Sequence, residues 1–224
     1  MKIAILGFGR EGESAYRYWL GKGAEIVVHD NNEALHLPDD IDAVLGNDAF
    51  VDLDQYNYDL LVRSPGLRLE AESITTPITT VTNEFLKQCP AKVIGVTGTK
   101  GKGTTSTLIY EILCLAGYRA HLLGNIGSPA LDELNNIKAD DVVVYEMSSF
   151  QLFDIETSPH VAVCLMVTED HLDWHKDLQE YQISKGNIFK YQKDSDVAVY
   201  FKDNSVSMSL SELSKADTKY SYGE

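Results

Sequence analysis

The residues best suited to chemistry lie in one stretch near the middle of the chain, Gly98-Thr99-Lys100-Gly101-Lys102-Gly103-Thr104-Thr105. An apolar run from Val93 to Thr97 precedes it and predicts a buried strand. A helical pattern follows it, with apolar residues on one face at Leu108, Ile109, Ile112, Leu113 and Ala116. A glycine loop between a strand and a helix N-terminus binds phosphate, because glycines let backbone N–H groups approach the anion. We therefore predict a phosphate site here.

This loop also carries charged and hydroxyl side chains. Lys102 adds a full positive charge to the partial charge of the helix end, and the hydroxyl of Thr104 or Thr105 is placed to reach a magnesium ion. The sequence of this loop departs from the common phosphate-loop motif, because Val96 and Gly103 stand where that motif has a glycine and a Ser or Thr. The alternative interpretation is a glycine-rich turn with incidental lysines.

Two side chains with metal-binding chemistry follow other strand-like runs. Glu146 ends the run 141–145, and His171 follows the run 160–167. In phosphate-loop enzymes the carboxyl ends of such strands hold the groups that bind magnesium. A carboxylate suits Mg²⁺, whereas histidine is a less usual ligand for it. A solvated strand end is the alternative for Glu146.

Two more residues in this half, His175 and Lys185, have side chains capable of chemistry. His171 and His175 are four residues apart, which on a helix would suggest zinc, but no third ligand is spaced for it and Trp174 indicates a packed turn. Lys185 lies on a helix predicted from Leu178 to Tyr191. From residue type alone, it is expected to be solvated.

A second glycine motif opens the chain. Residues 7–12, Gly-Phe-Gly-Arg-Glu-Gly, follow a strand-like run at Lys2–Leu6, and Asp30 stands about 20 residues further on, at the end of another strand. This is the dinucleotide fingerprint in its expected setting. Later, Ser64-Pro65-Gly66 makes a turn at the carboxyl end of a predicted strand, the edge where ligands collect in open α/β sheets.

Strand and helix patterns alternate along the whole chain. Further strands are expected at 42–45, 59–63, 78–82, 119–123 and 197–201, and a short helix at 83–87 leads to Pro90. This alternation predicts an α/β protein with parallel sheets, made of a Rossmann-like domain at 1–90 and a phosphate-loop domain at 91–224. The segment 203–224 is polar and serine-rich, with a weak strand pattern at Lys219–Tyr222.

Composition narrows the possible environments. The net charge of −15, from 34 acidic and 19 basic residues, argues against nucleic-acid binding, because such a surface would repel the phosphate backbone. No apolar run approaches the roughly 20 residues that span a bilayer, and a strand directly after Met1 leaves no room for a secretory leader. Three cysteines without pairing or metal spacing fit a reducing cytoplasm.

Several segments together carry a family resemblance. The loop 98–105 resembles the ATP loop of the Mur ligase superfamily, which includes folylpolyglutamate synthases. The segments Glu146-Met147-Ser148-Ser149-Phe150-Gln151-Leu152 and Val167–His175 are similar to segments of the members that add D-glutamate. The same members have segments similar to Gly124-Asn125-Ile126-Gly127, to Ser64-Pro65-Gly66 and to the spacing of Tyr181 and Lys185. These motifs occur in order from residue 1 to about 200.

The resemblance implies roles for the matching positions. It implies that ATP is bound by Gly98, Thr99, Lys100, Gly101, Lys102, Gly103, Thr104 and Thr105. It implies that the UDP-linked substrate is bound by Gly9, Arg10, Glu11, Asp30, Asn31, Ser64, Gly66, Asn125, Ser148 and Gln151. Two Mg²⁺ ions would be bound by Thr104, Glu146, His171 and Lys185, with Lys185 carbamylated. The catalytic residues would be Lys102, Glu146, His171 and Lys185.

The implied reaction belongs to peptidoglycan precursor synthesis. A carboxylate of UDP-N-acetylmuramoyl-L-alanine attacks the γ-phosphate of ATP, and D-glutamate then attacks the acyl phosphate to form an amide. The protein would be a cytoplasmic monomer that binds neither membranes nor nucleic acid. A third, C-terminal domain that holds most of the D-glutamate pocket is expected to be absent, so we expect this chain alone to be inactive.

Three departures from the resemblance leave alternatives open. Lys100 and Gly103 look more like the folylpolyglutamate synthase spelling, Met166 replaces an asparagine, and Phe201–Asn204 echoes an N-x-D-D motif only weakly. A folylpolyglutamate-synthase-like ligase is the nearest alternative within the superfamily, and a non-catalytic UDP- or ATP-binding module is an alternative that fits the length of the chain. A nicotinamide-dependent oxidoreductase would explain Gly7 to Asp30 but would leave the second loop and Glu146 without a role.

Overall fold

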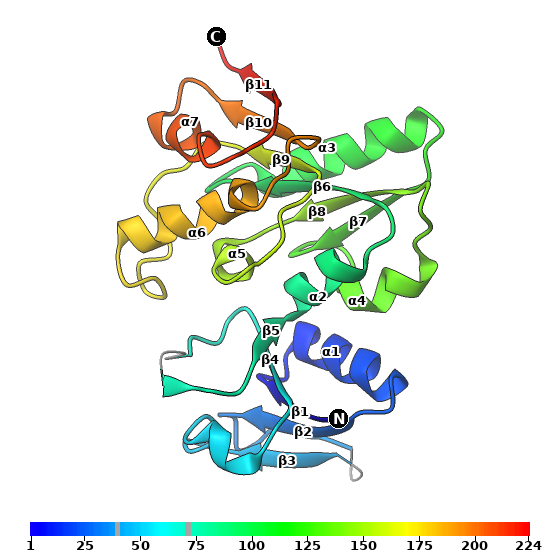
Figure 1. Ribbon diagram of the computed structural model, residues 1–224, viewed down its shortest axis with the longest axis vertical. Coiled ribbons are helices and arrows are strands. Elements are labelled where there is room, and N and C mark those ends of the chain that lie inside the picture. Colours follow the sequence, from blue (N-terminus) through cyan, green and yellow to red (C-terminus); the bar gives the residue numbers. More distant parts are fainter. Residues whose placement is uncertain (39–40, 70–72) are drawn as a thin grey trace. The chain divides into compact units, whose positions relative to one another are not determined.

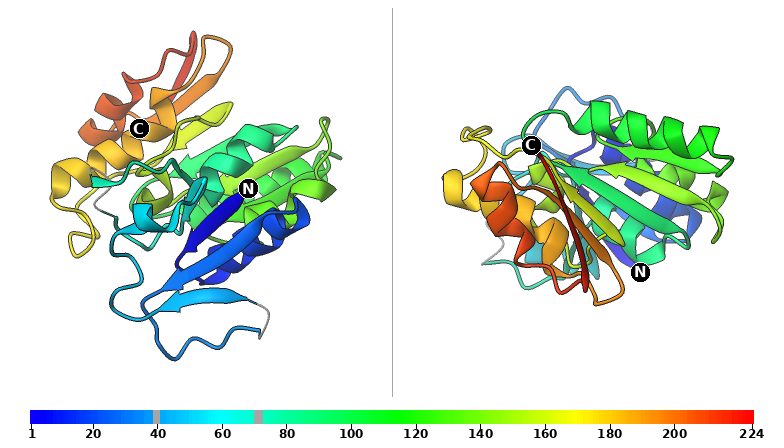
Figure 2. Two further views of the ribbon diagram at one scale, coloured as in Figure 1. Left: turned by 60° about the horizontal axis from the view of Figure 1, so that its bottom comes forward. Right: turned by 90° about the horizontal axis from the view of Figure 1, so that it is seen from above.

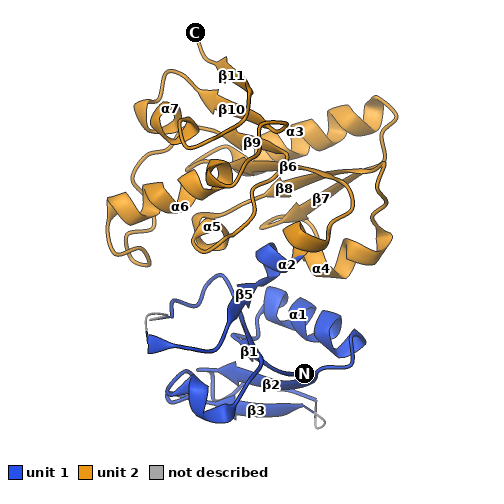
Figure 3. Cartoon of the chain, viewed as in Figure 1, with its two compact units in different colours: residues 1–84 blue, residues 85–224 orange. Residues whose placement is uncertain are grey.

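The computed structural model describes residues 1–38, 41–69 and 73–224. The chain divides into two compact units, residues 1–84 and 85–224 (Figure 3). The division falls within helix α2 (Val81–Gln88), a few residues before Pro90, where the sequence suggested a boundary. Each unit is an α/β layer structure built on a fully parallel sheet, which confirms the predicted fold class.

The first unit is built on a five-stranded sheet in the order β3-β2-β1-β4-β5 (Figure 1). Its elements are β1 (Lys2–Leu6), α1 (Arg10–Gly21), β2 (Glu25–Asp30), β3 (Asp42–Leu45), the 3₁₀ helix η1 (Leu53–Tyr56), β4 (Leu60–Arg63) and β5 (Ile78–Thr80). The central strand β1 pairs with β2 through Lys2↔Glu25 and with β4 through Ile3↔Leu60. The order therefore brings the ends of β1, β2 and β4 side by side.

Alternation along β1 divides the core of this unit between two faces of the sheet. Ala4 and Leu6 belong to a buried cluster that includes Leu53 of η1. Ile3 and Ile5 alternate with them and are also fully buried, so they face the other side of the sheet. A strand that is apolar at successive positions is thus explained by burial of both faces.

The second unit is built on a six-stranded sheet in the order β11-β10-β9-β6-β8-β7. Its strands are β6 (Lys92–Thr97), β7 (Ala120–Gly124), β8 (Val142–Glu146), β9 (Val161–Cys164), β10 (Val197–Phe201) and β11 (Thr218–Tyr222). Its helices are α3 (Lys102–Leu115), α4 (Ala130–Glu133), η3 (Leu134–Asn136), α5 (Ser149–Leu152), α6 (Leu178–Lys190) and α7 (Ser205–Ser211). Within this unit, α3 lies on one face of the sheet and α6 and α7 on the other (Figure 2).

The strand order decides which segments meet at the carboxyl edge of the second sheet. β6 lies between β8 and β9, so the loop after β6 is flanked by the residues that follow β8 and β9. The phosphate loop is therefore flanked by Glu146, the last residue of β8, and by the segment after β9 that leads to His171. Parallel pairing alone is thus enough to gather residues that are far apart in the sequence.

Several element boundaries differ from the sequence prediction. β5 ends at Thr80 rather than Thr82, because α2 begins at Val81 and the Thr80 hydroxyl accepts the Asn83 N–H at 3.0 Å. β9 ends at Cys164 rather than Val167. Helix α7 lies in the polar tail, which was not expected to be helical, and the Asn204 side chain accepts the Ser207 N–H at its start. The weak strand pattern near residue 220 corresponds to β11.

The predicted apolar face of helix α3 is partly wrong. Ile109 and Leu113 do pack against the sheet, but Leu108, Ile112 and Leu115 point outward and are 56%, 64% and 87% exposed. The helix is therefore apolar on two sides, one packed and one exposed. None of the helices in the described ranges is long and apolar enough to cross a membrane.

Candidate active site

The phosphate loop lies between the end of β6 and the start of α3, as predicted. Gly101 is the residue before the helix and has φ +86°, in the left-handed region. Gly98 has φ +145°, and a Cβ placed there would lie 2.7 Å from Cβ of Leu165. Both positions therefore require glycine. The first N–H groups of α3 have no acceptor within the helix and are available to an anion.

Thr99 was predicted to bind ATP, but its hydroxyl is already engaged within the protein. Its Oγ1 lies 2.8 Å from Oη of Tyr181, donates to the Thr168 carbonyl at 3.0 Å and accepts the Thr168 N–H at 2.9 Å. Its backbone N–H donates to the Met166 carbonyl at 2.8 Å. Thr99 thus fixes the loop against the segment after β9, whereas Lys100 and Thr104 are exposed.

Two lysine side chains converge on one carbonyl of this loop. Lys102 Nζ donates to the carbonyls of Gly98 and Thr99 at 3.0 and 3.1 Å. Lys185 Nζ, from α6, donates to the same Gly98 carbonyl at 2.9 Å. Lys185 is only 1% exposed, so the sequence-based expectation of a solvated lysine is wrong. Two ammonium groups in one buried place repel each other unless an anion joins them or one loses its proton.

The environment of Lys185 favours the loss of its proton. Burial, reinforced by the positive charge of Lys102, lowers the pKa of Lys185 to about 7. Its ammonium also lies 4.7 Å from the ring centre of Tyr181. Tyr181 is fully buried, and burial raises the pKa of its phenol to about 12. Near neutral pH a large fraction of Lys185 is therefore an uncharged amine, which is nucleophilic.

Glu146 has one free oxygen in a buried position. Asn125, from the loop after β7, donates to its Oε1 through Nδ2 at 3.3 Å. Its Oε2 is buried and has no hydrogen-bond partner in the described structure. A Cβ built on Gly103 would lie 3.5 Å from this Oε2, so the orphaned oxygen faces the first turn of α3. An unpaired buried carboxylate oxygen is costly, and a cation beside it would remove that cost.

These residues fit a magnesium ion. Mg²⁺ prefers oxygen ligands, keeps several waters and is usually held by one or two carboxylates together with substrate phosphates. Glu146 Oε2 and the Thr104 hydroxyl supply oxygen at the phosphate loop. Among residues 1–38, 41–69 and 73–224, no group of three His, Cys, Asp or Glu residues could hold a metal ion.

His171 lies in the segment after β9 in an unusual backbone conformation. Its φ is +54°, and its side chain is 43% exposed. Its Nε2 lies 3.5 Å from Oδ2 of Asp170, and its ring centre lies 4.9 Å from that of Phe150. No hydrogen bond or ion pair among the described residues joins it to Glu146 or Lys185. The strained conformation at a predicted metal ligand marks this loop as a functional candidate.

The segment after Glu146 forms a compact turn that opens α5. Ser148 caps the helix: its Oγ accepts the Gln151 N–H at 3.2 Å, and the Gln151 side chain accepts the Ser148 N–H at 2.9 Å. This capping box fixes both predicted substrate contacts relative to each other. Ser148 remains half-buried, whereas Gln151 is 2% exposed.

In the first unit, the predicted UDP-binding residues line the carboxyl edge of the sheet. Gly9 is the N-cap of α1, and Gly9, Arg10, Asn31 and Gly66 are exposed while Glu11 is half-buried. The Asp30 carboxylate accepts the Phe8 N–H at 2.7 Å and the Asn32 N–H at 2.9 Å. Asp30 thus holds the glycine loop from inside. The predicted loop, strand end and turn lie at one edge of the sheet.

Arg63 is a residue of this edge that the sequence did not reveal. It is the last residue of β4 and is 3% exposed. Its Nη1 donates to the carbonyls of Ser64, Pro65 and Leu67 at 3.1, 3.0 and 2.7 Å. The Ser64 hydroxyl donates to the Gly7 carbonyl at 2.6 Å. Arg63 therefore shapes the Ser-Pro-Gly turn, and Ser64 ties that turn to the glycine loop.

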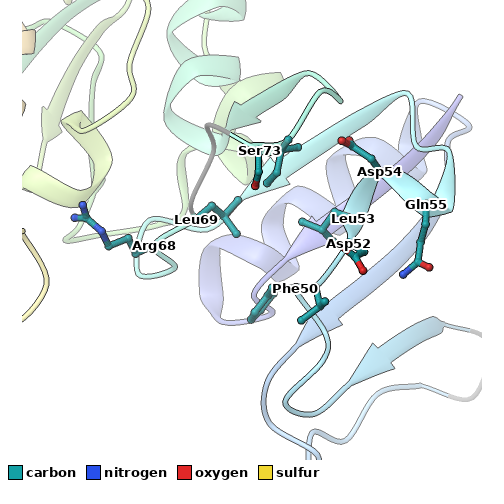
Figure 4. A pocket seen from close by; sticks show the side chains of 10 residues that line it. Phe50, Asp52, Leu53, Asp54, Gln55, Arg68, Leu69 and Ser73 are labelled. Atoms are coloured by element: carbon teal, nitrogen blue, oxygen red, sulfur yellow. The ribbon is translucent and has the colours of Figure 1, made fainter.

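A cavity of about 680 Å³ elsewhere in the first unit contains none of the predicted site residues (Figure 4). It is lined by Phe50, Val51, Asp52, Leu53, Asp54, Gln55, Arg68, Leu69, Ser73 and Ile74. The Asp54 carboxylate is engaged, because it accepts the N–H and hydroxyl groups of Thr75 and Thr76. Because no predicted site residue lines this cavity and its Asp54 carboxylate is engaged, the cavity is not the candidate site.

The second unit matches the family model of the Mur ligase middle domain over residues 96–224. Because this match covers more than half of the 224 residues, the chain belongs to the Mur ligase family. Members of this family are ATP-dependent ligases that form amide bonds. The family assignment agrees with the resemblance seen in the sequence.

Individual relatives sharpen this assignment. The chain is 38% identical over 223 residues to the UDP-N-acetylmuramoylalanine–D-glutamate ligase of Clostridium kluyveri, a match that covers 93% of this chain and 48% of that protein. The protein of the same name from Clostridium tetani is 37% identical over 223 residues, a match that covers 94% of this chain and 49% of that protein. The chain thus spans about half the length of the curated relatives it matches.

Solved structures share the fold at lower identity. A ligase from Neisseria meningitides for UDP-N-acetylmuramate and L-alanyl-gamma-D-glutamyl-meso-diaminopimelate has a TM-score of 0.63 and 18% identity, with 100% of this chain and 78% of that chain covered. UDP-N-acetylmuramate-alanine ligase from Thermotoga maritima has a TM-score of 0.53 and 20% identity, with 100% of this chain and 53% of that chain covered. At these identities the likeness shows the fold.

Proposed function

We propose that this chain provides the UDP-substrate-binding and ATP-binding parts of a ligase that adds D-glutamate to UDP-N-acetylmuramoyl-L-alanine in peptidoglycan precursor synthesis. The names of the relatives at 37–38% identity support the substrate pair. The observation that carries the proposal is the convergence of Lys102, Lys185 and the unpaired Glu146 oxygen on one glycine loop. A structural turn would need none of these three groups.

In the proposed reaction the loop binds the phosphates of ATP. The N–H groups at the start of α3 donate to phosphate oxygens, and Lys102 moves from the loop carbonyls to the β- and γ-phosphates. The substrate carboxylate attacks the γ-phosphate, which gives an acyl phosphate and ADP. The amine of D-glutamate then attacks the acyl carbon, and collapse of the tetrahedral intermediate forms the amide and releases phosphate.

Magnesium would be held at this loop by Glu146 Oε2 and the Thr104 hydroxyl, with His171 as a ligand of a second ion. When bound, Mg²⁺ neutralises charge on the phosphates that would otherwise repel the attacking carboxylate. Gly103 leaves room for this arrangement, because it presents no side chain toward the free oxygen of Glu146. The number of ions remains part of the proposal.

Lys185 is proposed to be carbamylated. Its uncharged amine would attack CO₂, forming an N–C bond and releasing one proton, so that a cation becomes an anionic carbamate. This change would relieve the repulsion between Lys185 and Lys102 at the Gly98 carbonyl. The carbamate oxygens would then serve as ligands for the second ion.

The first unit is proposed to bind the UDP part of the substrate through its glycine loop and the Ser-Pro-Gly turn. The contributing residues would be Gly9, Arg10, Glu11, Asp30, Asn31, Ser64 and Gly66. Asn125, Ser148 and Gln151 would contact the muramoyl-alanine part. Asp30 would be available to a hydroxyl or ring N–H of the nucleoside through the oxygen lone pairs that the backbone leaves free.

We further expect the 224 residues to bind substrates without completing amide formation, because the relatives named as ligases are about twice as long. D-Glutamate binding would depend largely on the remaining part of such a ligase. A monomeric state and a cytoplasmic location are part of this proposal.

Calorimetry with the purified chain tests the proposal. We expect UDP-N-acetylmuramoyl-L-alanine and Mg·ATP to bind independently, each with one site, and NADH not to bind. NADH binding without any response to UDP would favour an oxidoreductase and overturn the proposal. ADP release that depends on both UDP-N-acetylmuramoyl-L-alanine and D-glutamate would support the ligase assignment and refute the expected inactivity of the isolated chain.

A further inference from the structure

A buried histidine beside the candidate metal site has no role in the proposed reaction. His175 is 2% exposed and lies at the end of the segment that carries His171. Its Nε2 lies 3.0 Å from the Ser149 hydroxyl at the start of α5, and its Nδ1 lies 3.5 Å from Oε2 of Glu180 in α6.

The surrounding groups fix the orientation of the His175 ring. The ring stacks on Phe150 with an interplanar angle of 13° and meets Tyr181 edge-on at 5.3 Å between centres. Its backbone N–H donates to the His171 carbonyl at 3.0 Å. Nδ1 lies opposite the Glu180 carboxylate, and a proton on that nitrogen would leave Nε2 to accept the hydroxyl proton of Ser149.

Helix α5 depends on such outside contacts. It has only four residues, and a helix this short does not hold its conformation by its own hydrogen bonds. Asn187 of α6 donates to the carbonyls of Leu152 and Phe153 at 2.9 and 3.1 Å and so holds its carboxyl end. His175 holds the opposite end through Ser149. Helix α5 is thereby clamped to the helix that carries Lys185.

The serine, histidine and glutamate together resemble a nucleophilic triad, but the surroundings exclude that use. Ser149 is 2% exposed, and Phe150 covers the histidine ring, so a substrate carbonyl has no route to the hydroxyl. A group that is buried, oriented and bonded to three segments acts on their relative positions. Helix α5 begins three residues after Glu146, the loop before His175 contains His171, and Glu180 lies on the helix that carries Lys185.

We propose that His175 is a positioning residue of the metal-dependent nucleotide site, because its imidazole links the His171 loop, to which His175 belongs, with Ser149 of α5 and Glu180 of α6. This inference rests on the proposed function, which assigns Glu146, His171 and Lys185 to magnesium. A shift of α5 or of the His171 loop would move these ligands relative to the phosphate loop without altering the loop itself. The contribution of magnesium to nucleotide affinity is therefore the quantity that His175 controls.

The test compares ATP binding to the purified chain with and without magnesium, by calorimetry in MgCl₂ and in EDTA. We expect magnesium to raise the affinity of the native chain by at least tenfold. His175→Asn still faces Glu180 but cannot reach Ser149, so the enhancement should fall to about threefold or less. His175→Gln can accept the Ser149 hydroxyl proton at the Nε2 position and should keep most of the enhancement. Affinity in EDTA should be unchanged in both variants.

Ser149→Ala should reproduce the effect of His175→Asn, and the double variant should lose no more than either single one, because both remove the same contact. His160→Asn is the matched control. This exposed histidine precedes β9 at the opposite edge of the sheet, where its Nδ1 accepts the Val93 N–H at 3.2 Å, and the enhancement should be unchanged.

The outcomes separate the two proposals. A native chain that binds ATP equally well in MgCl₂ and EDTA would overturn the magnesium assignment and this inference with it. A native enhancement that survives in both His175→Asn and Ser149→Ala would overturn the role of His175 alone. If circular dichroism shows that His175→Asn does not fold, Ser149→Ala decides, because it removes only one oxygen atom.

Discussion

Both units place a glycine loop between a parallel strand and a helix, yet the groups that hold the two loops have opposite chemistry. In the first unit a carboxylate, Asp30, accepts a loop N–H group, and a hydroxyl, Ser64, donates to a loop carbonyl. In the second unit two amines, Lys102 and Lys185, donate to the same loop carbonyl.

This difference shows that strand, glycine loop and helix define a geometry and not a ligand. The second loop has internal cations that can turn toward a highly charged triphosphate. The first loop has its backbone braced by neutral and anionic groups, so its ligand must be recognised through the remaining N–H groups and exposed side chains. Variants that affect one loop and spare the other test this division.

The largest expected effect comes from removing the cation of the second loop. Lys102→Met should weaken ATP binding by at least 100-fold, because a charge-assisted contact to phosphate is lost in a partly desolvated site. UDP binding should not change. Calorimetry of both ligands measures this, with Lys92→Met as control, because Lys92 is an exposed lysine at the first position of β6, at the opposite end of that strand from the loop. Equal loss of both ligands would contradict the division of roles.

The next effect concerns close packing under the first loop. A Cβ at Gly12 would lie 2.1 Å from the Gly7 carbonyl oxygen, so Gly12→Ala should destabilise this unit by about 2 kcal/mol. At Gly9 no atom lies within 4 Å of such a Cβ, and Gly9→Ala should cost less than about 1 kcal/mol. Urea unfolding followed through Trp19, in a Trp174→Phe background, measures the difference. Equal costs would refute the packing argument.

The pH dependence of stability probes the second loop. Lys185 has a folded-state pKa of about 7 against 10.5 for an ordinary lysine, so the unfolded chain binds more protons between these values. Stability should therefore rise with pH in this window, by about 1.5 kcal/mol from pH 7.0 to 8.5. Urea unfolding in CO₂-free buffer checks this.

In the same measurement Lys185→Met should remove the rise. Lys190→Met, at an exposed position of the same helix, should retain it. A native chain whose stability is flat over this range would show that Lys185 keeps its proton when folded.

The smallest expected effect concerns the turn beside the first loop. Arg63→Met removes three hydrogen bonds to turn carbonyls and should weaken UDP binding about tenfold, while ATP binding stays unchanged. Arg17→Met is the control, because Arg17 is an exposed residue of α1, where its guanidinium lies 3.6 Å from the Glu13 carboxylate one helical turn earlier. Calorimetry with UDP measures both. If Arg63→Met keeps the native affinity for UDP, the hydrogen bonds of Arg63 to the turn have no role in binding.

Much of the architecture follows from local sequence. Runs such as Val142–Tyr145 and Val197–Phe201 predict strands because β-branched and aromatic residues dominate them, and the glycine loops mark where helices begin. Helix α7 could not be predicted in this way. Its alternating serines have weak helix propensity, and the helix owes its place to burial of Ser207, Leu210 and Ser211 in the folded unit.

The candidate site was predictable by residue type but not by environment. The loop 98–105 and Glu146 were found because their side chains suit phosphate and magnesium. Burial of Lys185 was not, since its contact with Gly98 joins residues 87 positions apart. The engagement of the Thr99 hydroxyl could not be predicted for the same reason, because its partner Tyr181 lies 82 positions further along the chain. Arg63 gave no signal at all, because a strand-ending arginine is normally solvated.

The outward side of α3 has a consequence for the behaviour of this chain in solution. Leu108, Ile112 and Leu115 form an exposed apolar stripe, and mutual repulsion between copies that each carry a net charge of −15 opposes their contact. Added salt shortens the range of this repulsion from about 30 Å at 0.01 M to about 3 Å at 1 M. Colloidal stability should therefore decrease as salt is raised, and Ile112→Glu should restore it.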